Sequence, residues 1–279
     1  MLRFIRVRLQ QGTRTSGFPH GGADFPSRFR GRPTLDPNRC GGTCSQCAAR
    51  APSSLIVPGQ DGGARLDLGA SLFAPEETEA CSRGAIQFTT DHRMAVRGRE
   101  DFVSGSGEVE LAQALDATSR RLFGRSLRLR SVSAGSCNGC EAELVALGNV
   151  VFDLARFGIQ FVASPRHADG IVVTGAVSRN MEAALYRTWE ATPAPRLIVV
   201  VGACAINGGP FRDSPEVLNG IPEGLPVDLW IAGCPPHPLT VADGMLRLLG
   251  RLEDGSRSMT STGPEQVQPE RTQGKAPRQ

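Results

Sequence analysis

The second half of the chain alternates short apolar runs with segments of helical periodicity. The apolar runs are LRLRSV from Leu127, IQFVA from Ile159, GIVVTG from Gly170, LIVVV from Leu197 and VDLWIAG from Val227. A helix is predicted between the third and fourth runs, near Arg179 to Glu190. Apolar strands that alternate with helices predict a parallel sheet that is covered by those helices.

Two longer segments also have helical periodicity. The segment from Cys140 to Gly158 predicts one helix, whose end is set by Gly158. One face of that helix would carry Leu144, Leu147, Val151, Leu154 and Phe157 and would pack on the sheet. The segment from Leu111 to Gly124 has apolar residues at helical spacing and predicts a connecting helix.

Composition divides the chain into four parts. Residues 1–103 are rich in Arg, Gly and Pro, which predicts a small, loop-rich domain that needs a metal or a partner for stability. Residues 104–125 form the connector, and residues 126–251 form an α/β domain with a flavodoxin-like parallel sheet. Residues 252–279 are dominated by polar residues, Gly and Pro, a composition typical of a disordered tail.

Charge and hydropathy exclude several classes of partner. The 31 basic and 28 acidic residues nearly balance, and aromatic residues make up 5% of the chain, so no nucleic-acid partner is expected. No apolar stretch reaches the roughly 18 residues that a membrane-spanning helix needs. Arg3, Arg6 and Arg8 interrupt the region in which a secretory signal would be apolar. We therefore expect a cytoplasmic chain.

Eight cysteines are the candidate chemistry of this chain. Disulfides are rare in the cytoplasm, so closely spaced cysteines there indicate metal sites. They fall into two groups of four, namely Cys40, Cys44, Cys47 and Cys81, and then Cys137, Cys140, Cys204 and Cys234.

The second cysteine group follows the predicted strands. Cys137 and Cys140 come after the first strand, Cys204 after LIVVV and Cys234 after VDLWIAG. Ligands of open parallel sheets gather at the carboxyl ends of the strands, so four thiolates from three loops can converge there. Such a set could hold an iron-sulfur cluster or a structural zinc ion, or the cysteines could be inert buried thiols.

Four motifs of this region resemble a known family. They are AGSCNGCE, SPRHADGIVVTGAVSRNM, GACAINGGPF and GCPPHP, which lie between Arg125 and Arg251. Together they resemble the small subunit of membrane-associated nickel-iron hydrogenases of the formate hydrogenlyase type, and the homologous 20 kDa subunit of respiratory complex I. The Cys137-Asn-Gly-Cys140 spacing resembles the hydrogenase branch, because complex I relatives have adjacent cysteines there. The resemblance implies one 4Fe-4S cluster on this group, placed against a large subunit.

The first cysteine group resembles a run of a bacterial ferredoxin with two clusters. Three cysteines lie in RCGGTCSQCAARAP, with one more residue between Cys40 and Cys44 than is usual. By register, the partner run from Leu66 to Ile86 keeps only Cys81. The last cysteine of each ferredoxin run ligates the other cluster, so Cys81 would complete the cluster of the first run. The slots of the second cluster hold Ala51, Ser71, Ala74 and Glu77. A zinc knuckle and a metal-free domain remain the alternatives.

The whole N-terminal segment resembles the ferredoxin-type subunit of formate hydrogenlyase, so the chain resembles a fusion of two subunits of one complex. The resemblance implies an oxidoreductase subunit with two 4Fe-4S clusters and no catalytic residue, which passes electrons to or from a hydrogenase-like large subunit. It also implies redox and membrane subunits as partners, and a position at the inner face of the cell membrane. The alternatives are a subunit of a quinone-linked, complex I-like oxidoreductase and a zinc-stabilised scaffold without redox function.

Overall fold

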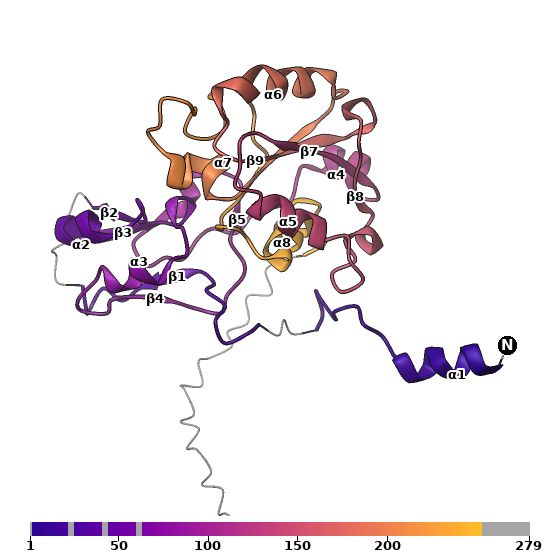
Figure 1. The fold of residues 1–279 in the computed structure, drawn as a ribbon, viewed down its shortest axis with the longest axis horizontal. Helices are drawn as coiled ribbons and strands as arrows, with labels where there is room; N and C mark the ends of the chain where they lie inside the picture. The colour runs from indigo at the N-terminus through magenta and orange to yellow at the C-terminus, as the bar shows by residue number, and fades with distance from the viewer. Residues whose placement is uncertain (1, 22–24, 41–43, 60–62, 253–279) are drawn as a thin grey trace, which may run out of the picture.

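The computed structural model describes residues 2–21, 25–40, 44–59 and 63–252 (Figure 1). The predicted tail, from residue 253 onward, therefore lies outside the described residues. The helices are α1 (Leu2–Gln11), α2 (Cys44–Arg50), α3 (Pro75–Glu79), α4 (Ala117–Phe123), α5 (Gly139–Ala146), α6 (Arg179–Ala191), α7 (Ala203–Asn207) and α8 (Pro238–Leu248). The 3-10 helices are η1 (Leu68–Ala70), η2 (Arg99–Phe102), η3 (Leu154–Phe157), η4 (Pro165–His167) and η5 (Gly209–Phe211).

The largest sheet is a six-stranded, mostly parallel one. Its strands, in spatial order, are β5 (Ala95–Val96), β11 (Leu229–Ile231), β10 (Leu197–Val201), β9 (Gly170–Thr174), β7 (Leu127–Ser133) and β8 (Ile159–Phe161). The five strands from β7 to β11 are parallel, and β5 pairs antiparallel with β11. Numbered along the chain, the parallel strands have the order 2-1-3-4-5, which is the order of flavodoxin-like sheets. The predicted parallel sheet is thus confirmed.

Both faces of this sheet are buried, which is why its central strands are continuous apolar runs. Every residue of β9 and β10 is buried. On one face, alternate strand residues pack with the buried sides of α5 and α8, and on the other face they pack against α6 and α7 (Figure 1). The helix predicted near residues 179–190 is confirmed as α6.

The two other predicted helices are shorter than expected. The helix after Cys140 ends at Ala146, because Asn149 turns the chain by accepting hydrogen bonds from the amides of Val151 and Phe152. The Val151 carbonyl in turn accepts a hydrogen bond from the Ser16 amide. Helical geometry returns only in η3, which ends at Gly158 as predicted.

The connecting helix also begins later than predicted, at Ala117. The Ala112 amide donates to the Ala95 carbonyl, and the Leu115 amide donates to the Leu248 carbonyl, so this stretch is tied to neighbouring elements. Asp116 then caps the helix by accepting from the amides of the second and third following residues.

Two small sheets lie between residues 33 and 104. One pairs β1 (Pro33–Leu35) with β4 (Ile86–Phe88), and the other joins β2 (Ile56–Pro58), β3 (Ala64–Asp67) and β6 (Val103–Ser104). They enclose a separate small core that includes Leu55, Leu66 and Cys81. A ferredoxin-like arrangement of this region stays a prediction, as do the domain boundaries.

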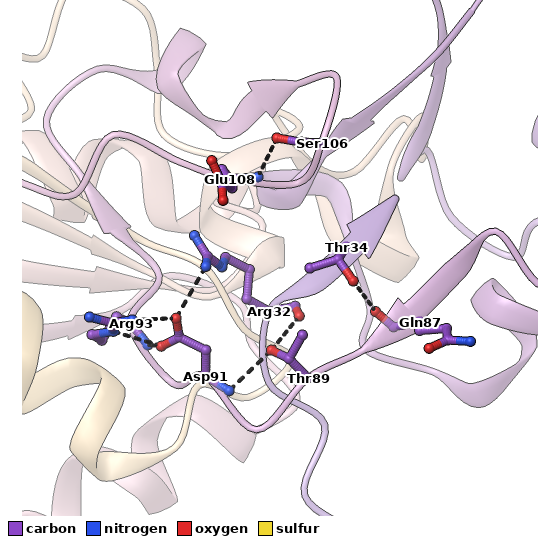
Figure 2. A network of polar contacts seen from close by, with 8 residues as sticks. All are labelled: Arg32, Thr34, Gln87, Thr89, Asp91, Arg93, Ser106 and Glu108. Atoms are coloured by element: carbon purple, nitrogen blue, oxygen red, sulfur yellow. Dashed lines mark hydrogen bonds and ion pairs between the residues drawn. The ribbon is translucent and has the colours of Figure 1, made fainter. Parts of the chain in front are cut away.

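The N-terminal region is nevertheless tied to the large sheet. Strand β5 lies within residues 1–103 and extends that sheet at its β11 edge. Just before β5, the carboxylate of Asp91 accepts hydrogen bonds from Arg93 at 2.8 Å and from Arg32 at 3.2 Å (Figure 2). Burial alone would raise the pKa of Asp91, but these arginines outweigh it and lower the pKa. The Asp91 network therefore joins the segment before β1 to the entry into the large sheet.

Helix α1 stands away from the rest of the chain (Figure 1). The side chains of Phe4 and Leu9 are 75% and 77% exposed. Among the residues that the structure describes, no helix is both long and apolar enough to cross a bilayer.

Candidate metal centres

The second cysteine group lies at the carboxyl edge of the large sheet. Cys137 and Cys140 follow β7, and Cys140 is in the first turn of α5. Cys204 is in the first turn of α7, directly after β10, and Cys234 follows β11. The order of the parallel strands reverses between β7 and β9, and this switch point is where flavodoxin-like sheets bind their ligands.

The thiols of this group are near enough to influence one another's charge. Burial raises the pKa of the Cys140 thiol, and the neighbouring Cys204, Glu141, Cys234 and Cys137 raise it further. Burial and the charges of Cys234 and Cys137 likewise raise the pKa of Cys204 to about 12. A positive group is therefore needed to hold these sulfurs as thiolates, as a bound metal does.

Two glycines leave room for the sulfurs. Gly202 has φ of 91° and ψ of 154°, a conformation that is open to few residues besides glycine. A Cβ atom at this position would lie 2.5 Å from the Sγ atom of Cys140. A Cβ atom at Gly209 would lie 2.9 Å from the Sγ atom of Cys204. At both positions the absence of a side chain leaves space around a cysteine sulfur atom.

Glu141 has a more specific environment than the sequence indicated. Its Oε1 atom accepts hydrogen bonds from Ser136 at 2.6 Å and from Thr174, at the end of β9, at 2.5 Å. Burial would raise the pKa of Glu141, but these hydroxyl donors lower it. Its Oε2 atom is buried and has no hydrogen-bond partner among the described residues. The sequence identified the glutamate but gave no sign of Thr174, which belongs to another strand.

His237 follows the Cys234 loop and caps α8. Its Nδ1 atom accepts a hydrogen bond from the Leu239 amide at 3.2 Å. The rings of Phe25, Phe29 and Phe152 lie edge-on to the imidazole, with centroids 5.1 to 5.6 Å away. Burial, and next the charge of His92, lower the pKa of His237 to about 4. The imidazole is therefore neutral at pH 7.

The first cysteine group brings together Cys40, Cys47 and Cys81. The thiol of Cys47 is hydrogen-bonded to Cys81 and is close enough to Cys40 for their charges to interact. Burial would raise the pKa of Cys81, but backbone N–H groups of Ala85, Arg83 and Ile86, together with Cys47, lower it. Cys44 begins α2, and its side chain lies outside the described residues.

The four slots without cysteine lie in the same region. Ala51 follows α2 and packs against the small core. Ala74 precedes α3, and Ser71 and Glu77 are both fully buried. The Ser71 hydroxyl donates to the Glu77 carboxylate at 2.7 Å. A polar contact thus joins two of the positions that the predicted register assigns to a second ferredoxin cluster.

None of the seven described cysteine side chains forms a disulfide. Within the described part of the chain, no three His, Cys, Asp or Glu side chains form a group that could hold one metal ion. For the second group, four thiols and a glycine-lined space fit the donor chemistry of an iron-sulfur cluster, whose usual ligands are four thiolates.

Comparisons with known proteins identify the region that carries this second group. The profile of the family "NADH ubiquinone oxidoreductase, 20 Kd subunit" matches residues 137–248. Formate hydrogenlyase subunit 7 of Escherichia coli is 41% identical over 144 residues, which cover 52% of this chain and 56% of the relative. The chain thus spans little more than half the length of that relative.

Two further relatives are covered more fully. The probable membrane-bound hydrogenase subunit mbhJ of Pyrococcus furiosus is 37% identical, over 47% of this chain and 79% of its own length. An NADH-quinone oxidoreductase subunit of Bacteroides thetaiotaomicron is 38% identical, over 53% of this chain and 81% of its own length. All three relatives are named as subunits of oxidoreductases, so the hydrogenase and complex I resemblance is confirmed for the C-terminal region. The chain belongs to the NADH ubiquinone oxidoreductase 20 Kd subunit family.

Proposed function

We propose that the chain is an electron-transfer subunit of a membrane-associated hydrogenase-like complex and has no catalytic centre of its own. It would hold two 4Fe-4S clusters, one on Cys137, Cys140, Cys204 and Cys234 and the other on Cys40, Cys44, Cys47 and Cys81. The observation that carries the proposal is the convergence of four thiols from three loops at the carboxyl edge of the sheet, within the region that matches the family.

Bound clusters would supply one-electron redox chemistry. The residues of the chain would bind the clusters, exclude water and adjust their potentials. Cys140 and Cys204 are buried, and the Sγ atom of Cys140 faces Gly202. At the first site, the backbone donors from Arg83, Ala85 and Ile86 favour the thiolate form of Cys81.

The first site belongs to the second part of the proposal, a ferredoxin-like domain that is fused to the family domain. Cys40, Cys47 and Cys81 already influence one another's ionisation, which supports a shared site. The proposed domain boundaries are residues 1–103, 104–125 and 126–251. Strand β5, from the N-terminal region, adds to the sheet of the family domain.

The relatives support the choice of partners. Their names place them in formate hydrogenlyase, a membrane-bound hydrogenase and NADH-quinone oxidoreductase. We infer that this chain binds a hydrogenase-like large subunit and further redox and membrane subunits, at the cytoplasmic face of the membrane. Helix α1 supports that location, because it exposes Phe4, Leu9 and two neighbouring arginines, Arg3 and Arg6.

A quinone-linked oxidoreductase of the complex I type is the second candidate function, because subunits of NADH-quinone oxidoreductases are among the relatives. The Cys137-Asn-Gly-Cys140 spacing favours the hydrogenase branch. Cysteine pairs in the sequence of the neighbouring large subunit would indicate a nickel-iron centre, and their absence would favour the quinone-linked candidate.

Iron analysis tests the cluster proposal directly. Anaerobically purified chain is expected to be brown and to contain about eight irons and eight acid-labile sulfides, for two clusters of four irons. The Cys81→Ser variant should lose about half of both, whereas Ser82→Ala, at the exposed neighbouring position, should lose none. A colourless protein that contains zinc and no sulfide would instead establish the scaffold alternative. About twelve irons would contradict the loss of the second ferredoxin cluster.

A further inference from the structure

Glu77 is a buried carboxylate that the proposed electron transfer leaves without a role. It lies in α3 and is 0% exposed, whereas Glu76 and Glu79 of the same helix are less buried. Its Oε1 atom accepts hydrogen bonds from the Leu72 amide at 2.7 Å and from the Ser53 hydroxyl, and its Oε2 atom accepts from the Ser71 hydroxyl. A charge that is buried this completely is costly unless its donors are arranged in advance.

The groups that meet the Glu77 carboxylate are arranged as hydrogen-bond donors. The Ser71 oxygen accepts a hydrogen bond from the Phe73 amide at 3.1 Å, and the Ser53 oxygen accepts one from the Leu55 amide at 3.3 Å. Each serine is thereby left with its hydroxyl proton to donate, and both protons point to Glu77. The carboxylate thus accepts three hydrogen bonds and has no proton of its own to donate, which matches its ionised form.

This charge lies beside the second cysteine group. The loop that donates to Glu77 continues from η1, and η1 lies against α7. A Cβ atom at Gly69 of η1 would come within 2.9 Å of Ile206 of α7. The next residue of the loop, Phe73, and the ligand-loop residue Cys234 line one cavity of about 240 Å³. The charge of Glu77 also acts on the pKa of the Cys234 thiol, which is raised by burial, by Cys137 and by Glu77.

By the ferredoxin register, Ser71 and Glu77 stand where cysteines of a second cluster would be. The hydrogen bonds of Glu77 therefore stabilise the chain where a second cluster would stabilise a ferredoxin. In place of a redox group, the chain has a fixed negative charge that acts on the family domain.

We propose that Glu77 is a positioning residue for electron transfer, whose buried negative charge lowers the reduction potential of the cluster held by Cys137, Cys140, Cys204 and Cys234. The inference rests on the proposed function, since it requires a cluster at that site. Reduction adds one electron there, so a nearby negative charge makes reduction less favourable.

A potentiometric titration followed by electron paramagnetic resonance tests this effect. The full chain with Cys81→Ser serves as the background, so that only the second site is titrated. Adding Glu77→Gln should favour the reduced form by about tenfold, which is about 59 mV for one electron. Glu77→Asp should restore most of the low potential, and Glu76→Gln, which removes an exposed charge from the same helix, should leave it unchanged.

The outcomes separate the two proposals. Absence of iron and sulfide from the background protein would refute the cluster itself. A loaded cluster whose potential is equal in Glu77→Gln and Glu76→Gln would overturn the role of Glu77 and leave the cluster proposal intact. If Glu77→Gln does not fold, the combined Glu77→Met, Ser71→Ala and Ser53→Ala variant removes the charge together with its hydroxyl donors, and the same comparison applies.

Discussion

Gly202→Ala is the substitution that most directly tests the space around the second cysteine group. Gly202 has φ of 91° and ψ of 154°, and a non-glycine residue in this conformation costs about 1 to 3 kcal/mol. The new methyl group would also lie 2.5 Å from the Sγ atom of Cys140. Forcing such an overlap in a packed site typically costs about 1 to 3 kcal/mol. The variant is therefore expected to lose about 2 to 6 kcal/mol of folding free energy.

Gly224→Ala is the matched control. Gly224 has φ of 93°, and a Cβ atom there would meet nothing within 4 Å. This substitution therefore imposes backbone strain without any overlap, and its cost should stay within about 1 to 3 kcal/mol. The difference between the two variants isolates the contact with the cysteine sulfur.

Two assays follow the effect. Urea unfolding monitored by circular dichroism compares the free energy of unfolding of both variants, and iron analysis measures the clusters that remain. Gly202→Ala should lose about half of the iron, and Gly224→Ala should lose none. In metal-free protein, Cys140→Ala should reduce the cost of Gly202→Ala, because it removes the atom that is overlapped. Equal stability and equal iron content for Gly202→Ala and Gly224→Ala would refute the close approach of Gly202 to the sulfur.

Three further predictions concern other parts of the chain. Asp91→Asn should cost about 1 to 3 kcal/mol in urea unfolding, because it removes the charge and leaves only one oxygen to accept from Arg93 and from the largely buried Arg32, whereas Asp213→Asn, with a side chain 80% exposed, should be neutral. The folded pKa of His237, about 4, lies below its ordinary value of 6.5, so its contribution to stability is complete above pH 6.5 and is lost between pH 6.5 and 4. Replacing His237 with Gln should flatten that part of the stability profile, by about 1 to 2 kcal/mol after allowance for partial exposure. Deleting residues 2–11 should abolish sedimentation with anionic vesicles and leave the iron content unchanged, and retained binding would exclude α1 as the membrane contact.

The large sheet could be predicted from the sequence because burial on both faces leaves a strong local signal. Strands β9 and β10 are buried throughout and almost entirely apolar, and they are followed by Gly175 and Gly202, which have positive φ. The same reasoning placed the second cysteine group, since the carboxyl ends of parallel strands must share one edge.

The end of α5 was not predicted, because the apolar spacing continues past the local turn at Asn149, and part of what holds that turn lies far away in the chain. Apolar spacing continues through Val151, but Val150 and Val151 accept hydrogen bonds from the Thr15 hydroxyl and the Ser16 amide. Their side chains are 66% and 41% exposed instead of packing on the sheet. Periodicity describes a possible helix face, and competing backbone partners decide whether the helix continues.

Glu77 shows a similar limit at the candidate sites. The predicted ferredoxin register places Glu77 where a cysteine ligand would be. The absence of the cysteine by itself suggests only that no cluster binds there. Its donors, Ser53, Leu72 and Ser71, include a residue 24 positions away, and no local pattern links that serine to Glu77. The hydrogen-bonded charge at this predicted slot is visible only when all its donors are placed in space.

The packing of the N-terminal region on the family domain has a physical consequence for how the two cysteine groups are held. If residues 1–103 only tethered a ferredoxin-like unit to the family domain, the groups could move relative to each other. Instead β5 pairs with β11, just before the Cys234 loop, and Phe25 packs on His237 just after that loop. The N-terminal region therefore packs on both sides of the Cys234 loop. Electron transfer between the two proposed clusters would depend on this packing as well as on the connecting segment.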